Sequence, residues 1–66
     1  MGKKFVFSIL RSLDNFSKVR IYSQYGENTL SYAEGTANDT HIMNYAKFEV
    51  CGYEVTEDNV HVIYVY

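Results

Sequence analysis

Residue types that often stabilise small proteins are scarce in this chain. It has no proline and no tryptophan among its 66 residues, and Cys51 is the only cysteine. A single cysteine excludes a disulfide within the chain. Cys51, His41 and His61 also lack the close ligand pairs of a structural zinc site. We therefore expect no metal and no cofactor.

Long hydrophobic runs are also missing. The apolar stretch at residues 5–10 contains a serine and stops at Arg11. It is too short for a membrane span or for the apolar region of a signal peptide. The residues that follow Gly2 do not match a myristoylation motif, since valine stands where Ser or Thr is needed. We expect a cytoplasmic protein with no membrane partner.

What the chain does contain is typical of a folded domain. It is 47% hydrophobic and 17% aromatic, with seven tyrosines. Disordered chains have far fewer aromatic and apolar residues, so we expect this chain to fold. A domain of this size buries only about 60% of the surface that its unfolded chain exposes. One domain over residues 1–66 therefore needs further stabilisation, and oligomerisation is the leading candidate.

Apolar residues near the N-terminus recur at helical spacing. The set comprises Val6, Ile9, Leu10, Leu13 and Phe16. Intervals of three and four residues place side chains on one stripe of a helix, which predicts a helix over residues 4–14. Alternation of Phe5, Phe7 and Ile9 leaves a strand as the competing interpretation.

The next segment predicts a hairpin over residues 18–35. Val19 and Ile21 alternate with polar or charged residues, as in a half-buried strand. Gly26 supplies the turn. Leu30 and Tyr32 then alternate on the returning strand.

A polar connector and a second hairpin complete the predicted fold. Residues 36–46 carry the candidate N-caps Asn38, Asp39 and Thr40, enough for a short helical turn. Residues 47–55 and 59–66 flank a turn, and Gly52 marks a bulge. We predict an α+β fold, in which one N-terminal helix packs on a small antiparallel four-stranded sheet of two hairpins, with a short helical connector.

The last strand is apolar on both faces. His61, Ile63 and Val65 point one way, and the other face carries Val60, Val62, Tyr64 and Tyr66. One short helix covers a single side of a sheet, so the second set is predicted to form the interface of a homo-oligomer, through the sheet face or through edge pairing of the terminal strands. The alternative is a central strand covered on both faces within the chain.

Charge is divided along the sequence. Residues 1–20 hold five basic residues and one acid, whereas residues 21–66 hold one lysine and seven acids. Arg11, Lys18, Arg20 and Tyr22 are the candidate contacts for nucleic acid or for a protein partner. Tyr22 suits base stacking as well as a protein interface. The competing interpretation of the basic residues is a solvated surface paired with the acidic half.

Signals for catalysis are weak. Cys51 lies in an apolar strand, where free cysteine usually acts as a small hydrophobic residue. His61 is flanked by valines and fits a rim or an interface better than a general base. Asp14, among Arg11, Lys18 and Arg20, is the one weak catalytic candidate, with capping or salt bridging as the alternative. We expect a protein that is not an enzyme.

The segments "ILRSLDNFSKVRIYS", "YAEG" and "KFEVCGYEVTEDNVHVIYV" resemble small orphan proteins encoded by phages and prophages of gut Firmicutes. The resemblance spans nearly the whole chain as a hydrophobic pattern. It implies a counter-defence role such as that of anti-CRISPR proteins, with a host Cas nuclease as the partner. The basic N-terminal region supports an alternative, a module that binds or nicks DNA.

Overall fold

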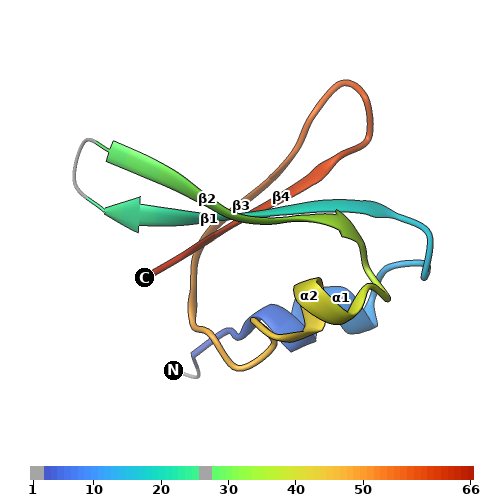
Figure 1. The fold of residues 1–66 in the computed structure, drawn as a ribbon, viewed down its shortest axis with the longest axis horizontal. Coiled ribbons are helices and arrows are strands. Elements are labelled where there is room, and N and C mark those ends of the chain that lie inside the picture. Colours follow the sequence, from blue (N-terminus) through green and yellow to red (C-terminus); the bar gives the residue numbers. More distant parts are fainter. Residues whose placement is uncertain (1–2, 26–27) are drawn as a thin grey trace.

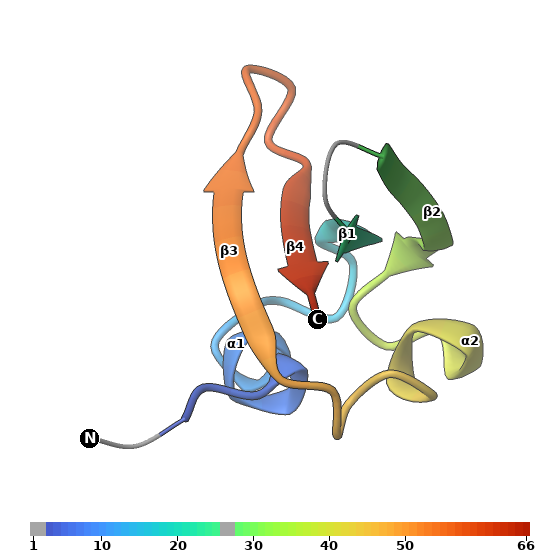
Figure 2. The ribbon, with the colours of Figure 1, turned by 90° about the vertical axis from the view of Figure 1, so that its left-hand side faces the viewer.

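The computed structural model describes residues 3–25 and 28–66, with side chains described for residues 3–23 and 29–66. The described residues form two short helices, each followed by two strands (Figures 1 and 2). In chain order they are α1 (Val6–Arg11), β1 (Lys18–Tyr25), β2 (Asn28–Thr36), α2 (Thr40–Met43), β3 (Val50–Val55) and β4 (His61–Val65). The predicted α+β class is confirmed.

The four strands form a mixed sheet in the order β2-β1-β4-β3. β1 pairs with β2, and β3 with β4, in antiparallel fashion. The two central strands, β1 and β4, run parallel, with Ile21 opposite Ile63. The prediction of a sheet that is antiparallel throughout is therefore wrong. Alternating apolar residues indicate which segments are strands, but carry no information on the direction in which two hairpins meet.

β4 is apolar on both faces because it lies at the centre of the sheet. Ile63 and Val65 are fully buried on one face, and Val62 is only 4% exposed on the other. Because β4 has a neighbour on both sides, its backbone is already paired. β4 therefore offers no free backbone edge to a second copy. The homo-oligomer itself stays a prediction.

The core lies on the side of the sheet that carries both helices (Figure 1). It joins residues of α1, β1, α2 and β4, together with Ala37, in one buried cluster: Val6, Ile9, Leu10, Val19, Ile21, Ala37, Ile42, Ile63 and Val65. The buried residues of α1 follow the three- and four-residue spacing of its sequence. Helical periodicity and strand alternation thus identified most of the core.

Helix α1 is much shorter than the predicted helix over residues 4–14. Phe5 takes an extended conformation and forms an isolated antiparallel bridge with Glu49. Leu13 packs against the core after the helix has ended, but Phe16 is 83% exposed. The chain must leave the helix early to enter β1, so tertiary structure overrides the longer apolar pattern. The competing strand interpretation is wrong, because Phe7 and Ile9 lie in α1 and Phe5 forms only an isolated bridge outside the strands.

Both antiparallel pairs contain an irregularity. Between Val50 and Gly52 the register shifts by one residue, at Cys51, which confirms the predicted bulge. A second shift between Ile21 and Tyr22 leaves Tyr32 without a direct partner on β1. The turn predicted at Gly26 lies outside the described residues.

The connector forms one helical turn, α2, whose N-cap is Asp39. This agrees with the short helix predicted for residues 36–46. The Asp39 side chain makes no capping hydrogen bond to the helix. It turns instead toward the end of β2, as described below.

Candidate functional site

The face of the sheet opposite the helices, here called the open face, carries polar and aromatic side chains. Successive residues of a strand point to opposite sides. Val19 and Ile21 enter the core, so Lys18, Arg20 and Tyr22 project from the open face. Partners in register place Glu34 of β2 and Val62 of β4 on either side of Arg20.

Arg20 forms an ion pair with Glu34 across the two strands. The Arg20 Nε atom lies 3.0 Å from Glu34 Oε2, and both side chains are substantially exposed. An exposed pair of this kind contributes about 0–1 kcal/mol to stability. Its main consequence is electrostatic, since the charge of Arg20 is balanced by an adjacent carboxylate.

Two tyrosines occupy the next row of the open face. The rings of Tyr22 and Tyr64 lie 5.9 Å apart at an angle of 52°. The Tyr64 hydroxyl donates a hydrogen bond of 2.6 Å to Glu54 Oε2. This bond to a carboxylate stabilises the neutral phenol and raises the pKa of Tyr64 above its ordinary value. Gly52 makes room for the pair, because a Cβ atom there would lie 3.3 Å from the Tyr64 ring.

A hollow of about 380 Å³ adjoins these residues. Its lining residues come from the start of β1, the end of β2 and the loop between β3 and β4. Its lining includes Lys18, Arg20, Glu34 and Asp58, beside the apolar Val60. Two cations and two acids leave the hollow electrically balanced, so it does not select a phosphate by charge alone.

The structure brings together three of the four predicted contact residues. Lys18, Arg20 and Tyr22 share the open face, whereas Arg11 lies in α1 on the helix side. Basic residues of the N-terminal half also pair with acids of the second half. Lys3 lies 3.8 Å from Glu49, and Arg20 pairs with Glu34. This favours the interpretation of a solvated, charge-paired surface over a continuous basic patch.

The four residues predicted to form the oligomer interface differ in how far they are exposed. Val60, Val62 and Tyr64 follow one another at alternate positions on the open face. Val62 is already sheltered within the chain, and Val60 and Tyr64 are half-buried. Tyr66 is 67% exposed. Val62 is therefore not an exposed apolar residue that needs a second copy to bury it. The oligomer interface stays a prediction.

The weak catalytic candidates lie apart. Asp14 is exposed in the loop before β1 and makes no ion pair with another described residue. Cys51 is a free, half-buried thiol at the bulge. The His61 Nδ1 atom and the Tyr53 hydroxyl share a 2.6 Å hydrogen bond, whose direction depends on the histidine tautomer. The two rings are stacked. Within the described ranges, no three His, Cys, Asp or Glu residues gather as a metal site would require.

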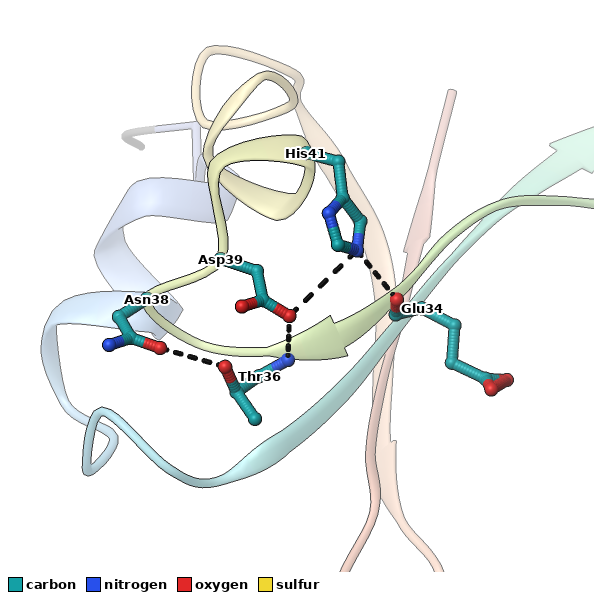
Figure 3. Close-up of polar contacts among 5 residues, drawn as sticks. All are labelled: Glu34, Thr36, Asn38, Asp39 and His41. Carbon is teal, nitrogen blue, oxygen red and sulfur yellow. Dashed lines mark hydrogen bonds and ion pairs between the residues drawn. The ribbon is translucent and has the colours of Figure 1, made fainter.

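A polar cluster between β2 and α2 was not found from the sequence (Figure 3). The Asp39 Oδ2 atom accepts a hydrogen bond of 2.8 Å from the Thr36 backbone N–H. His41 Nε2 lies 2.7 Å from the Glu34 carbonyl oxygen and 3.9 Å from Asp39 Oδ2. Since a carbonyl only accepts, Nε2 carries the proton. The Asn38 side-chain oxygen accepts from the Thr36 hydroxyl at 2.7 Å.

This cluster is a clasp that ties α2 to the end of β2. The Thr36 hydrogen bond is the main cause that lowers the pKa of Asp39 below its ordinary value of 3.8. Both His41 Nε2 and Asp39 Oδ2 are engaged by backbone groups, so neither is available to activate a nucleophile. The sequence signal was the run Thr36-Ala37-Asn38-Asp39, because Asn and Asp side chains commonly bond nearby backbone in turns.

None of the helices in the described part of the chain has the length and apolar character needed to cross a membrane. Comparison with protein-family models, with curated proteins and with solved structures finds no match to this chain.

Proposed function

We propose that this chain is a non-enzymatic interaction protein of a phage or prophage, which binds and inhibits a host defence nuclease in the cytoplasm. Its role would be counter-defence of the anti-CRISPR type, with a Cas nuclease as the partner. The open face is the contact surface in this proposal.

The observation that carries the proposal is the composition of the open face. Tyr22, Tyr64 and Arg20 stand side by side, and tyrosine and arginine are enriched among the residues that dominate binding energy at protein interfaces. The Tyr64 hydroxyl is hydrogen-bonded to Glu54, and Gly52 leaves room for the Tyr64 ring. A preorganised aromatic surface loses little conformational entropy on binding.

Acidic side chains make a nuclease a suitable partner. Glu34, Glu54 and Asp58 lie on or beside the open face. A nuclease presents a basic groove to the phosphates of its substrate. Carboxylates aimed at such a groove compete with those phosphates, which gives an inhibitor that needs no chemistry of its own.

A cell assay tests this proposal. Cells expressing a Cas nuclease are transformed with a targeted plasmid, with or without this protein. We expect the protein to restore plasmid survival, and Tyr22→Leu or Arg20→Gln to reduce the protection. Lys47→Gln is the matched control, because Lys47 is exposed in the segment between α2 and β3, where the carbonyls of Ala46 and Phe48 accept hydrogen bonds from α1. No protection from any resident nuclease contradicts the proposal.

Lys18, Arg20 and Tyr22 on one face of β1 also favour a second function, binding of single-stranded DNA. Sheet platforms bind single strands by stacking bases on aromatic rings beside basic groups. Balanced charge weakens this candidate, because phosphate binding needs an excess of cations. An electrophoretic mobility assay at low salt separates the two functions. Unchanged mobility of single-stranded and supercoiled DNA removes the second one, and nicking would appear as relaxed plasmid.

A further inference from the structure

A second hollow lies between residues 7–15, which include most of α1, and the segment 37–43. Its volume is about 260 Å³. Leu10 and Ala37 are nearly buried and line its base. Phe7 and Met43, 40% and 49% exposed, contribute large apolar side chains to its rim. We call this hollow the inter-helix groove.

Three polar residues, Arg11, Asn15 and Asn38, line the inter-helix groove, and each of them carries hydrogen-bond donors; the Asn15 amide also has an acceptor oxygen. Arg11 is exposed and makes no ion pair with another described residue. The Asn38 side-chain oxygen is occupied by the Thr36 hydroxyl, so its amide N–H groups remain to donate. Figure 3 shows the Asn38 nitrogen on the side away from Thr36. Among the described lining residues Arg11 is the only charged one, and no acid opposes it.

We propose that the inter-helix groove binds an acidic peptide segment of a protein partner, in which an apolar side chain stands next to an Asp or Glu. The groove is smaller than the usual 300–1,000 Å³ of a small-molecule site, and it suits one side chain. The apolar side chain packs between Phe7 and Met43. The neighbouring carboxylate accepts hydrogen bonds from the Arg11 guanidinium, whose planar set of N–H groups matches a carboxylate.

Charge complementarity selects this occupant. A single arginine is too little cationic charge for a nucleic-acid backbone, whose binding requires several phosphate contacts. An isolated apolar peptide would leave Arg11 unused at the rim. Since α1 lies on the opposite side of the sheet from Lys18 and Arg20, this site is distinct from the open face and goes beyond the function proposed above.

Nuclear magnetic resonance titration of the folded protein tests the site. The probe is the dipeptide N-acetyl-Leu-Asp-amide, with the neutral N-acetyl-Leu-Asn-amide and the truncated N-acetyl-Gly-Asp-amide as matched ligands. We expect saturable shifts of the Met43 methyl, the Phe7 ring and the Arg11 Nε–H signals. The dissociation constant should be on the order of a millimolar, as suits so small a ligand.

The neutral dipeptide should bind about threefold to fivefold more weakly, which is the range of an exposed charge contact. Arg11→Gln should abolish the difference between the Asp and Asn probes, while Lys18→Gln, on the open face, should preserve it. Absence of saturable shifts, equal affinity for the Asp and Asn probes, or an unaltered preference in Arg11→Gln overturns the proposal. Because Arg11 is exposed, a dispersed spectrum is expected for the variant, and the comparison does not depend on the nuclease assay.

Discussion

The clasp between β2 and α2 requires a residue without a side chain at position 35, where the chain has Gly35. A Cβ atom at Gly35 would collide with the Asp39 carboxylate and approach His41 Nε2 to 2.8 Å. These two side chains cannot move away without losing their hydrogen bonds to Thr36 and Glu34. Gly35→Ala should therefore lower the free energy of unfolding by about 1–3 kcal/mol.

Chemical denaturation of both proteins measures this difference. Gly52→Ala serves as the control, because its new Cβ atom would meet only the Tyr64 ring, at 3.3 Å. Its cost should be smaller. If Gly35→Ala lowered the free energy of unfolding by no more than Gly52→Ala does, the Asp39 and His41 side chains would be able to move aside without cost, which contradicts the prediction.

Asp39 gives the same cluster a pH dependence. Its pKa is lower in the folded protein than its ordinary value of 3.8, chiefly because of the Thr36 N–H. A lowered folded pKa adds stability above the unfolded value, and this stability is lost as the pH falls through the folded pKa. The advantage of the native protein over Asp39→Ala should be fully present at about pH 5 and should shrink as the pH falls below 3.8. Thermal unfolding across this range measures it, and a constant difference down to pH 2 contradicts it.

Helix α2 is anchored to the core by a single buried residue. A four-residue helix has no stability of its own, and Ile42 is its fully buried side chain. Ile42→Ala should cost about 2–5 kcal/mol, and Ile42→Val about 0.5–1.5 kcal/mol. The smaller change keeps the measurement possible if the alanine variant unfolds. Met43→Ala, at a position 49% exposed, is the control, and a similar loss there would contradict the assignment.

Strand β1 contains a buried polar group that lowers the stability of the fold, the Ser23 hydroxyl. Ser23 follows Val19 and Ile21 on the core side and is fully buried, but its Oγ atom has no hydrogen-bond partner among the described residues. A buried unpaired hydroxyl is costly. Ser23→Ala should raise the free energy of unfolding by about 1 kcal/mol. The exposed Ser31→Ala should leave it nearly unchanged, and a loss of stability in Ser23→Ala would mean that the hydroxyl is satisfied.

At the scale of the whole molecule, self-association through the open face remains a prediction. Light scattering at micromolar concentration should give twice the 7.7 kDa chain mass for a homodimer, or four times that mass for a dimer of dimers. Tyr66→Ser should weaken the dimer with little effect on the fold, because Tyr66 is 67% exposed. A single-chain mass at all concentrations would contradict the prediction. Val62, already sheltered within the chain, contributes little to the expected interface.

Much of the local structure is encoded in short-range pattern. Alternation of Val19 and Ile21 identified β1, and the position of Gly52 identified the bulge. The three candidate N-caps at residues 38–40 identified the region in which α2 starts, and the structure has Asp39 as its N-cap. These features were predictable because each depends on neighbours within a few residues.

The candidate sites depend on contacts between distant segments. Lys18, Arg20 and Tyr22 were known as a group, but Glu34 and Tyr64, which determine their charge balance and packing, reach them only through strand pairing. Arg11 was separated from that group because α1 lies on the other side of the sheet.

By itself, the sequence determined the α+β class, the positions of the strands and most of the core, because these follow from the periodicity of apolar side chains. Only the tertiary structure decided that β1 and β4 run parallel at the centre of the sheet and that α1 ends at Arg11. The physical reason is that strand order and direction are set by which arrangement buries the most apolar strands on both sides. That free-energy comparison involves the whole chain and is not contained in any one segment.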